Sequence, residues 1–322
     1  MSSLIEQAAQ RLEQLRRAGA VVADAKPSQR LPGGGHAAAA PEPEAPPAVA
    51  AVESRRVDLD FTALAATGLL VPNAPRSLLG DQFRVVKRPL IRNAMGKGAS
   101  KLAHGNLIMI TSAVAGEGKS FTAVNLAMSI ATELDHTVML VDADVARPSV
   151  SRMLGLVSGS EPAYGPGLLD VLEGRAEMSS VLVKTNIDKL TVLPSGTQHA
   201  RATELLASEA MTRLLDEMGR RYADRIIIFD SPPLLLTTEA RVLATHMGQV
   251  VVVVQAERTL QADVQTALAT IESCPVRLLL LNRAQATAVG GYGYGYGYGY
   301  GYGRGRGRGL ATDTSVLEAP TA

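Results

Sequence analysis

A lysine and a serine at the start of one helix are the residues best placed for phosphate chemistry. The apolar run 107–110 is expected to be a strand, and it leads through a loop from Thr111 into Gly118-Lys119-Ser120 and an apolar-periodic helix. Backbone N–H groups of such a loop and of the helix N-terminus form an anion-binding nest. Lys119 is expected to neutralise the β- and γ-phosphates of a nucleotide, and the Ser120 hydroxyl to ligate Mg²⁺.

The expected nucleotide contacts lie in one short segment. Ala113 stands where the usual pattern has its first glycine, so the strand–loop–helix context supports the prediction as much as the motif does. The predicted nucleotide-binding residues are Ala115, Gly116, Glu117, Gly118, Lys119, Ser120 and Phe121.

Three aspartates follow two other predicted strands at their carboxyl ends, where open α/β sheets bind ligands. Asp142 and Asp144 come after the apolar run 138–141, and Asp230 follows the run 226–229. Because Asp142 and Asp144 are two residues apart, extended geometry would point them the same way. One is expected to help hold a hydrated metal while the other faces a reacting hydroxyl. Asp230 is placed to hold a Mg²⁺-bound water.

Apolar strands alternate with helical segments, which predicts an α/β fold with a mostly parallel sheet covered by helices on both faces. Near-continuous apolar runs such as 250–254 are typical of strands buried on both faces. The expected strands are Leu107–Thr111, Thr137–Val141, Leu190–Leu193, Arg225–Phe229, Gln249–Val254 and Val276–Leu281. The expected helices are Leu78–Ile91, Lys119–Glu133, Thr203–Tyr222, Glu239–His246 and Thr259–Ser273.

Composition divides the chain into four parts. Residues 1–20 contain an amphipathic helix over Leu4–Arg17, which we expect to serve docking or oligomerisation, and 21–56 form a linker rich in Pro, Ala and Gly. The α/β domain is expected at 57–285, followed by a disordered tail at 286–322.

Charge and cysteine content exclude several protein classes. The net charge of +1 gives no global footprint for nucleic acid. A single cysteine, Cys274, excludes a disulfide scaffold and fits a reducing cytoplasm. No apolar window is long enough for a transmembrane helix, and the five histidines lack metal-ligand spacing, so no metal beyond Mg²⁺ is expected.

Six of the eight tyrosines alternate with glycine near the C-terminus. Glycine at every second position argues against a packed strand, so the segment is expected to be disordered. Because a phenol can accept a phosphoryl group, the tail is either a substrate of the upstream nucleotide site or a self-associating linker. The Arg/Gly repeat that follows indicates no definite role. The candidate phosphoacceptors are Tyr292, Tyr294, Tyr296, Tyr298, Tyr300 and Tyr302.

The chain resembles the bacterial tyrosine autokinases (BY-kinases) of exopolysaccharide and capsule systems. Thr111–Ser120 matches the family's Walker A motif of the deviant type, Val138–Asp144 its Walker A′ and Ile226–Pro233 its Walker B. The N-terminal helix, the linker and the sequence from Asp142 to Pro148 are similar to the exosortase-associated subgroup. The resemblance covers about residues 1–20 and 75–302, and the tyrosine tail agrees with it.

The resemblance implies an ATP- and Mg²⁺-dependent protein-tyrosine kinase with a P-loop NTPase fold. By position, Lys119 and Ser120 would bind the ATP phosphates and Mg²⁺, and Asp142 and Asp230 would organise the metal. Asp144 would orient or deprotonate the tyrosine hydroxyl. The implied catalytic residues are Lys119, Asp142 and Asp144, and the implied metal ligands are Ser120, Asp142 and Asp230.

The resemblance also implies an assembly. Asp81, Arg84 and Lys87 stand at the positions of the family's E-x2-R-x2-R oligomerisation motif, in a degenerate copy because lysine lacks arginine's bidentate fork. In the phosphate loop, Ala115 replaces a common proline, and Ala146 stands where many members have arginine. The implied partners are further copies of the chain, as in a ring, a membrane-anchored chain-length determinant (polysaccharide co-polymerase) and a cognate tyrosine phosphatase. The implied location is the cytoplasm, peripherally at the inner face of the membrane.

Two other functions remain open from sequence. A partitioning-type ATPase shares the fold, but it carries a second lysine where this chain has Val114 and lacks the tyrosine tail. A non-catalytic ATP-binding regulator of a polysaccharide machine would not need the carboxylates and Lys119 that this chain retains.

Overall fold

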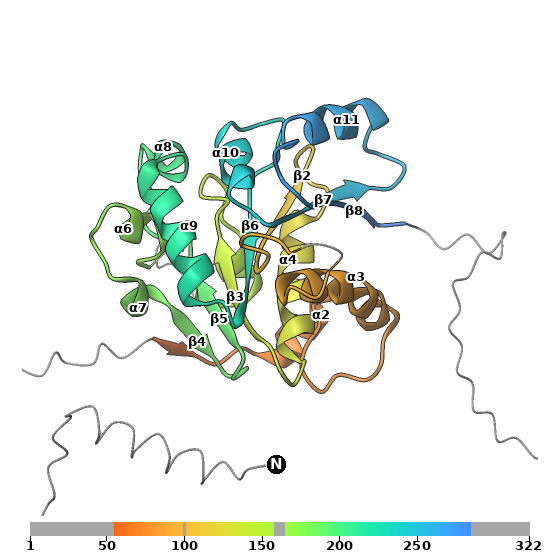
Figure 1. Cartoon of the computed structure of the whole chain (residues 1–322). Helices are drawn as coiled ribbons and strands as arrows, with labels where there is room; N and C mark the ends of the chain where they lie inside the picture. Colours follow the sequence, from red (N-terminus) through yellow and green to blue (C-terminus); the bar gives the residue numbers. More distant parts are fainter. Residues whose placement is uncertain (1–54, 99–100, 158–164, 285–322) are drawn as a thin grey trace, which may run out of the picture. The chain divides into compact units, whose positions relative to one another are not determined.

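An eight-stranded sheet forms the centre of the computed structural model, which describes residues 55–98, 101–157 and 165–284 (Figure 1). Its strand order is β1-β4-β5-β3-β6-β2-β7-β8. The strands are β1 (Arg56–Val57), β2 (Leu107–Ser112), β3 (Thr137–Asp142), β4 (Val183–Thr185), β5 (Leu190–Leu193), β6 (Arg225–Asp230), β7 (Gln249–Gln255) and β8 (Arg277–Asn282). The predicted helix Leu4–Arg17, most of the linker and the tyrosine tail lie outside the described residues.

Among the described strands, neighbours in the sheet are parallel, except for the antiparallel pair of β4 and β5. All six predicted strands are present, most with one extra residue at the carboxyl end. The side chains of β2 are entirely buried, as are nearly all those of β3 and β6, because helices cover both faces. The prediction of a mostly parallel α/β sheet is therefore confirmed.

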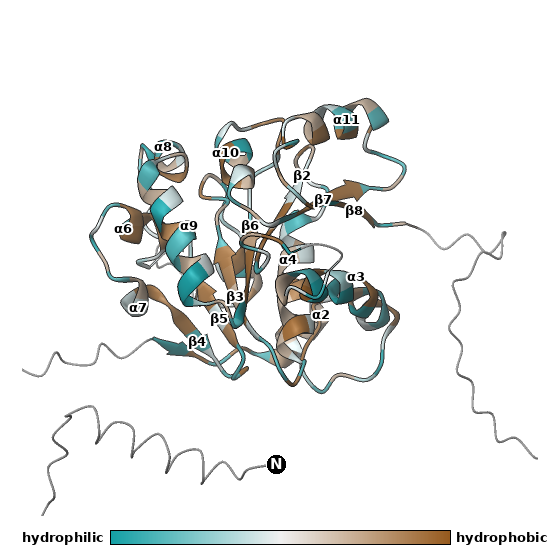
Figure 2. Cartoon of the chain, in the orientation of Figure 1, coloured by the Kyte–Doolittle hydropathy of each residue, from teal (hydrophilic) through white to brown (hydrophobic). Residues whose placement is uncertain are grey.

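Helices pack on the two faces of the sheet and form two hydrophobic cores (Figure 1). One core joins α2 (Phe61–Ala66), α3 (Leu78–Ala94), α4 (Lys119–Ala131) and α5 (Val150–Met153) to side chains such as Ile108 and Leu140. The other core joins the remaining helices to Met109, Val141 and Phe229. Those helices are α6 (Leu168–Leu172), α7 (Met178–Val181), α8 (Ala202–Leu206), α9 (Glu209–Arg221), α10 (Glu239–Thr245) and α11 (Gln261–Ala269). Figure 2 shows the apolar strands in brown between helices that carry teal, hydrophilic residues.

The predicted helix Thr203–Tyr222 is wrong in one respect, because the structure divides it into α8 and α9. Ser208 begins the second helix as its N-cap: its backbone is extended, with ψ 161°, and its hydroxyl accepts a hydrogen bond from the N–H of Met211 at 3.3 Å. Serine is favoured at this position since it satisfies a donor that the first helical turn leaves unpaired. The short elements β1, β4, α2 and α5–α7 were not predicted, because segments of two to six residues carry no readable periodicity.

The strand order brings three separate motifs to one edge of the sheet. β6 lies between β3 and β2, and Asp142 is the register partner of Asp230. The phosphate-loop candidate follows β2, so it lies beside both aspartates at the carboxyl ends of the strands. In the described part of the chain, no helix has the length and apolarity needed to cross a membrane.

Candidate functional site

A loop between β2 and α4 forms the centre of the candidate site. Gly116 and Gly118 have φ values of 86° and 94°, in the left-handed region that glycine adopts without strain. Gly118 is also the N-cap of α4, and a Cβ there would collide with the side-chain amide of Asn282. The backbone thus turns directly from the strand into a helix N-terminus, as a phosphate-binding loop requires.

Lys119 lies among the three aspartates that the sequence singled out. Its Nζ is 2.5 Å from Asp144 Oδ2 and 3.9 Å from Asp230 Oδ1, and it also lies 3.3 Å from the Ser120 hydroxyl. Burial lowers the pKa of Lys119, but attraction to Asp230, Asp144 and Asp142 outweighs burial, so the pKa lies above its ordinary value. The ammonium therefore stays charged and can neutralise an anion.

Asp142 ends β3 and is fully buried. Its Oδ2 accepts hydrogen bonds from the backbone N–H groups of Ser149 and Val150, both at 3.0 Å. Its Oδ1 has no hydrogen-bond partner among the described residues. Burial, followed by repulsion from Asp230, raises the pKa of Asp142 well above its ordinary value. Asp144 has different contacts, because its Oδ1 accepts from the Arg147 N–H at 3.2 Å while Oδ2 binds Lys119.

Asp230 ends β6 and is also fully buried. Burial raises its pKa to about 6, although Lys119 acts in the opposite direction. The nearby Ser120 hydroxyl also lowers that pKa, yet neither Asp230 oxygen has a partner in hydrogen-bond geometry within the described ranges. Lys119 lies 3.9 Å from Oδ1, beyond hydrogen-bond distance, so a bound cation or water would satisfy these buried oxygens.

The carboxylate and hydroxyl oxygens at this site suit a magnesium ion that also binds water better than they suit a metal held by protein ligands alone. Asp142 Oδ1 and both Asp230 oxygens lack hydrogen-bond partners among the described residues, and the Ser120 hydroxyl lies near Asp230. The part of the chain that the structure describes has no group of three or more His, Cys, Asp or Glu side chains arranged to hold a metal. Mg²⁺ characteristically uses one or two carboxylates and takes its other ligands from water and substrate phosphates.

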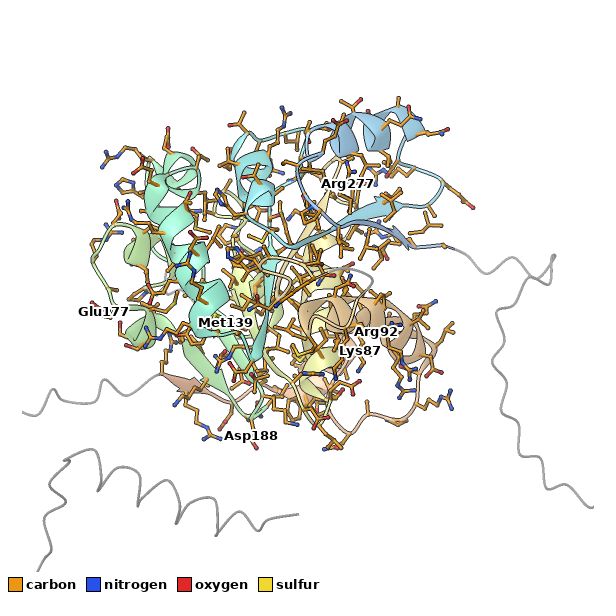
Figure 3. The ribbon with its side chains drawn as sticks, in the orientation of Figure 1. Lys87, Arg92, Met139, Glu177, Asp188 and Arg277 are labelled. Carbon is orange, nitrogen blue, oxygen red and sulfur yellow. The ribbon has the colours of Figure 1, made fainter. Side chains whose placement is uncertain are left out.

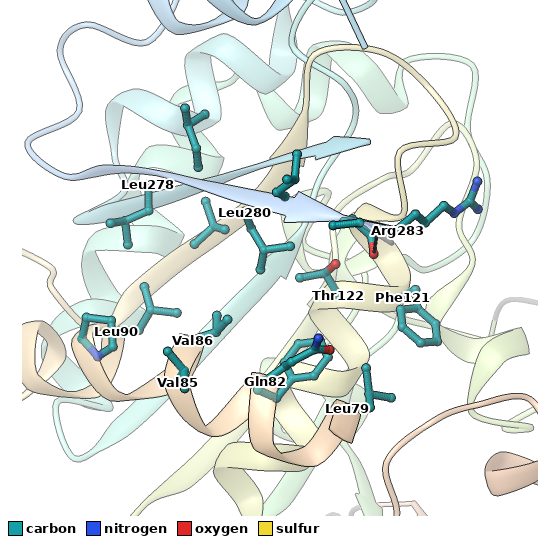
Figure 4. A pocket seen from close by; sticks show the side chains of 17 residues that line it. Leu79, Gln82, Val85, Val86, Leu90, Phe121, Thr122, Leu278, Leu280 and Arg283 are labelled. Atoms are coloured by element: carbon teal, nitrogen blue, oxygen red, sulfur yellow. Dashed lines mark hydrogen bonds between the residues drawn. The ribbon is translucent and has the colours of Figure 1, made fainter. Parts of the chain in front are cut away.

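Two other residues of the predicted nucleotide site, Glu117 and Phe121, have side chains with contacts elsewhere in the protein. The Glu117 carboxylate is buried and hydrogen-bonded within the protein. Glu117 would therefore contribute its backbone N–H, and not its side chain, to a phosphate site. The Phe121 side chain lines an apolar groove of about 730 Å³ with Leu79, Val86 and Leu280 (Figure 4). Phe121 therefore faces α3 and β8. The nucleotide contacts given for residues 115–121 stay predictions.

The three residues of the predicted oligomerisation motif on α3 differ in exposure: two lie at the surface and one is buried. Asp81 binds Arg84 at 2.5 Å and Arg76 at 3.0 Å on the surface. Lys87 (labelled in Figure 3) is only 4% exposed. Its Nζ donates to the Ser129 carbonyl at 2.6 Å and lies 2.5 Å from Glu133 Oε1, at the C-terminal end of α4. Lys87 thus holds α3 on α4, and only Asp81 and Arg84 of the motif present their side chains to solvent.

Lys87→Met is expected to lower the free energy of unfolding by about 2 kcal/mol, because hydrogen bonds of a buried charged group are lost. The Lys87 hydrogen bond lowers the pKa of Glu133, so this stabilisation is present above the unfolded-state pKa of Glu133. It should shrink as pH falls below about 4. Denaturant unfolding at pH 7 and pH 3.5 measures both effects. The exposed neighbour Arg88→Met is the control, and an equal loss in both variants would contradict the role given to Lys87.

The sequence did not predict the residues outside the loop that form hydrogen bonds with Glu117. Gln255, Thr259 and Asn282 bond to Glu117 from 138 to 165 residues away along the chain. Gln255 and Asn282 end β7 and β8, so the rule that selected Asp230, a polar residue closing an apolar strand, also selects these two. The candidate phosphoacceptor tyrosines lie outside the described residues.

Comparison with known proteins shows the family to which the chain belongs. The family model described as AAA domain matches residues 105–279. The tyrosine-protein kinase YwqD of Bacillus subtilis (strain 168) is 32% identical over 205 residues, which cover 64% of this chain and 80% of YwqD. The tyrosine-protein kinase ptk of Acinetobacter johnsonii is 32% identical over 58% of this chain, but the match spans only 25% of that longer protein. The crystal structure of the chimerical protein CapA2B2 is 27% identical with a TM-score of 0.55, and the match covers 69% of this chain and 92% of that one.

Proposed function

Because the chain belongs to the AAA-domain family and, within it, to the tyrosine-protein kinases like YwqD, we propose that it transfers the γ-phosphoryl group of ATP to tyrosines of its own C-terminal tail. The observation that carries the proposal is Lys119, which lies at the end of the phosphate-loop candidate within 4 Å of both Asp144 and Asp230. One cation among carboxylates at the ends of two neighbouring strands is suited to binding a magnesium nucleotide and receiving a hydroxyl.

The proposed chemistry needs positioning and charge neutralisation more than covalent catalysis. Lys119 and the loop N–H groups bind the phosphates of ATP. Mg²⁺, held by Ser120, Asp142 and Asp230, would neutralise charge on the phosphate oxygens. The tyrosine oxygen forms a bond to the γ-phosphorus, the bond to the β–γ bridging oxygen breaks, and ADP leaves.

Asp144 receives the tyrosine hydroxyl in this scheme. A free phenol has a pKa near 10, so it arrives protonated, and Asp144 orients it and accepts its proton as the new bond forms. Asp144 is bonded to Lys119 in the structure. Phosphate groups that draw Lys119 toward them would release Asp144 for the incoming hydroxyl, which ties acceptor binding to ATP binding.

The tail supplies the acceptors in this proposal. About ten residues separate Asn282 from Tyr292 and span at most ~35 Å when extended, which is enough to reach a neighbouring copy's site. Alternating glycine lets any of the six tyrosines enter a narrow cleft. Each phosphate adds about −1.5 to −2 charges, so a modified tail becomes acidic and repels its neighbours.

We extend the proposal to the setting that the resemblance implies. The kinase domain spans 57–285, self-association uses the exposed Asp81 and Arg84 of α3, and a ring is one form of it. The activator is a membrane-anchored chain-length determinant, which recruits the chain to the inner face of the membrane, and a cognate phosphatase reverses the reaction. The regulated process is exopolysaccharide polymerisation and export.

Replacing all six tail tyrosines by phenylalanine is expected to reduce autophosphorylation to the level of a Lys119→Met variant while leaving nucleotide affinity unchanged. Phenylalanine keeps the ring and removes the acceptor oxygen. Phosphosite mapping after incubation with Mg·ATP, with and without the membrane partner, checks the result. Tyr222 is the control tyrosine and should stay unmodified, because its ring packs in the folded domain. The ring centre lies 5.8 Å from the guanidinium carbon of Arg221 and 5.2 Å from that of Arg225. Unmodified tail tyrosines in the presence of the activator would instead favour a non-catalytic regulator.

A further inference from the structure

The phosphate-loop candidate contains a buried carboxylate that is bonded within the protein. Glu117 is only 2% exposed. Its Oε2 accepts from the Val114 N–H at 2.8 Å, and its Oε1 accepts from the Gln255 N–H at 3.2 Å and from the Thr259 hydroxyl. Three donors from three segments, namely the loop itself, the end of β7 and the residues before α11, therefore converge on one side chain.

A carboxylate is otherwise an unfavourable residue for this loop. Its charge repels the phosphates that the loop is shaped to bind, and burying it is costly unless donors satisfy it. The three donors satisfy the Glu117 carboxylate within the protein. The Val114 N–H is occupied by Glu117, so the phosphate donors of the proposed site are the N–H groups of the loop from Ala115 onward.

A second contact holds the same residue by its backbone. The Asn282 side-chain amide donates to the Glu117 carbonyl at 2.8 Å, and Asn282 Oδ1 accepts from the Arg283 N–H at 2.9 Å. Arg283 has a φ of 57°, which is uncommon for a residue with a side chain, and it donates to Gln255 Oε1 at 3.3 Å. The ends of β7 and β8 are thereby joined to each other and to the loop.

We propose that Glu117 is a positioning residue that, together with Thr259 and Asn282, preforms the phosphate loop before a nucleotide arrives. In this group, which we call the loop clamp, Thr259 and Asn282 each donate a hydrogen bond to Glu117, and the Glu117 side chain acts on the loop and not on the nucleotide. A loop that is already ordered binds its ligand without losing conformational freedom at that moment, so the clamp raises nucleotide affinity. The inference rests on the proposed function only in that the loop binds a nucleotide.

Glu117→Gln and Thr259→Val test the clamp in the full chain. Glutamine offers one acceptor oxygen and one NH₂ group, so at least one of the three donors loses its partner. Valine removes the Thr259 donor. Each change is expected to weaken Mg·ADP binding, measured by calorimetry, by about tenfold or more, since hydrogen bonds to a charged group are lost. The effects of the two changes on Mg·ADP affinity should not add in the double variant, because Glu117 and Thr259 are bonded to each other.

Thr266→Val is the matched control, because Thr266 lies in α11 and its hydroxyl donates only to the local Ala262 carbonyl. Melting temperatures separate positioning from simple stabilisation. A fall in melting temperature with unchanged Mg·ADP affinity in Thr259→Val overturns the proposal, and so does equal weakening in Thr266→Val. If Glu117→Gln does not fold, Thr259→Val and Asn282→Ala decide the question. Wild-type protein that binds Mg·ADP without phosphorylating tyrosine would contradict the proposed function and leave the clamp standing.

Discussion

Lys119→Met is expected to reduce tyrosine phosphorylation by about 10³-fold or more, because one preorganised cation stabilises the charge of the transferring phosphoryl group. The same change leaves Asp142, Asp144 and Asp230 without the ammonium that lies among them. The pKa values of Asp142 and Asp230, which burial already raises, should then rise further. Phosphotyrosine formation from labelled ATP and Mg·ADP affinity measure the outcome.

The control for this variant is Lys184→Met. Lys184 is exposed on β4, at the antiparallel side of the sheet and away from the strand ends that carry the aspartates. Lys184→Met should retain full activity and nucleotide affinity. Substantial phosphorylation by Lys119→Met would mean that the loop does not bind the reacting phosphates.

Asp230→Asn is expected to abolish phosphorylation and, at the same time, to stabilise the nucleotide-free protein at neutral pH. The folded-state pKa of Asp230 is raised to about 6, so the folded protein resists ionising this group more than the unfolded chain does. The penalty is absent below about pH 4, where the group is protonated in both states, and complete above about pH 6. It amounts to about 2–3 kcal/mol, or several degrees of melting temperature in a domain of this size.

Melting curves at pH 4, 6 and 8 without Mg²⁺ test the sign of this effect. The stability gain of Asp230→Asn over the wild type should be near zero at pH 4 and largest at pH 8. Asp188→Asn, an exposed aspartate (labelled in Figure 3), should show no such gain. Adding Mg·ADP should raise the melting temperature of the wild type more than that of Asp230→Asn. If the variant is less stable than the wild type at pH 8, the ion pair between Lys119 and Asp230 stabilises the folded protein more than the burial of Asp230 destabilises it.

The elements that could be predicted were those whose signal is local. The six strands were readable because parallel strands are apolar along their whole length, and the aspartates because each directly follows such a run. The sheet order then brings Asp142 and Asp230 together, which the strand-end rule anticipates for parallel sheets.

The rest depended on contacts that no local pattern encodes. Lys87 occupies a motif position associated with assembly, yet it is buried because α3 packs across the C-terminal end of α4. The partners of Glu117 come from strand ends more than a hundred residues away. The antiparallel strand β4 has three residues, too few to show a period. In each case packing between distant segments decides the environment of the residue.

The place of β6 in the sheet also bears on how the protein is made. β6 is the sixth of the sheet's eight strands to be synthesised, yet it must lie between β3 and β2. Asp142 and Asp230 are accordingly about ninety residues apart in sequence. A nascent chain that has emerged only as far as β5 therefore carries the loop and Asp142 but lacks the strand that aligns them. Nucleotide binding should begin only after β6 inserts, so ATP would stabilise the finished domain and not its folding intermediates.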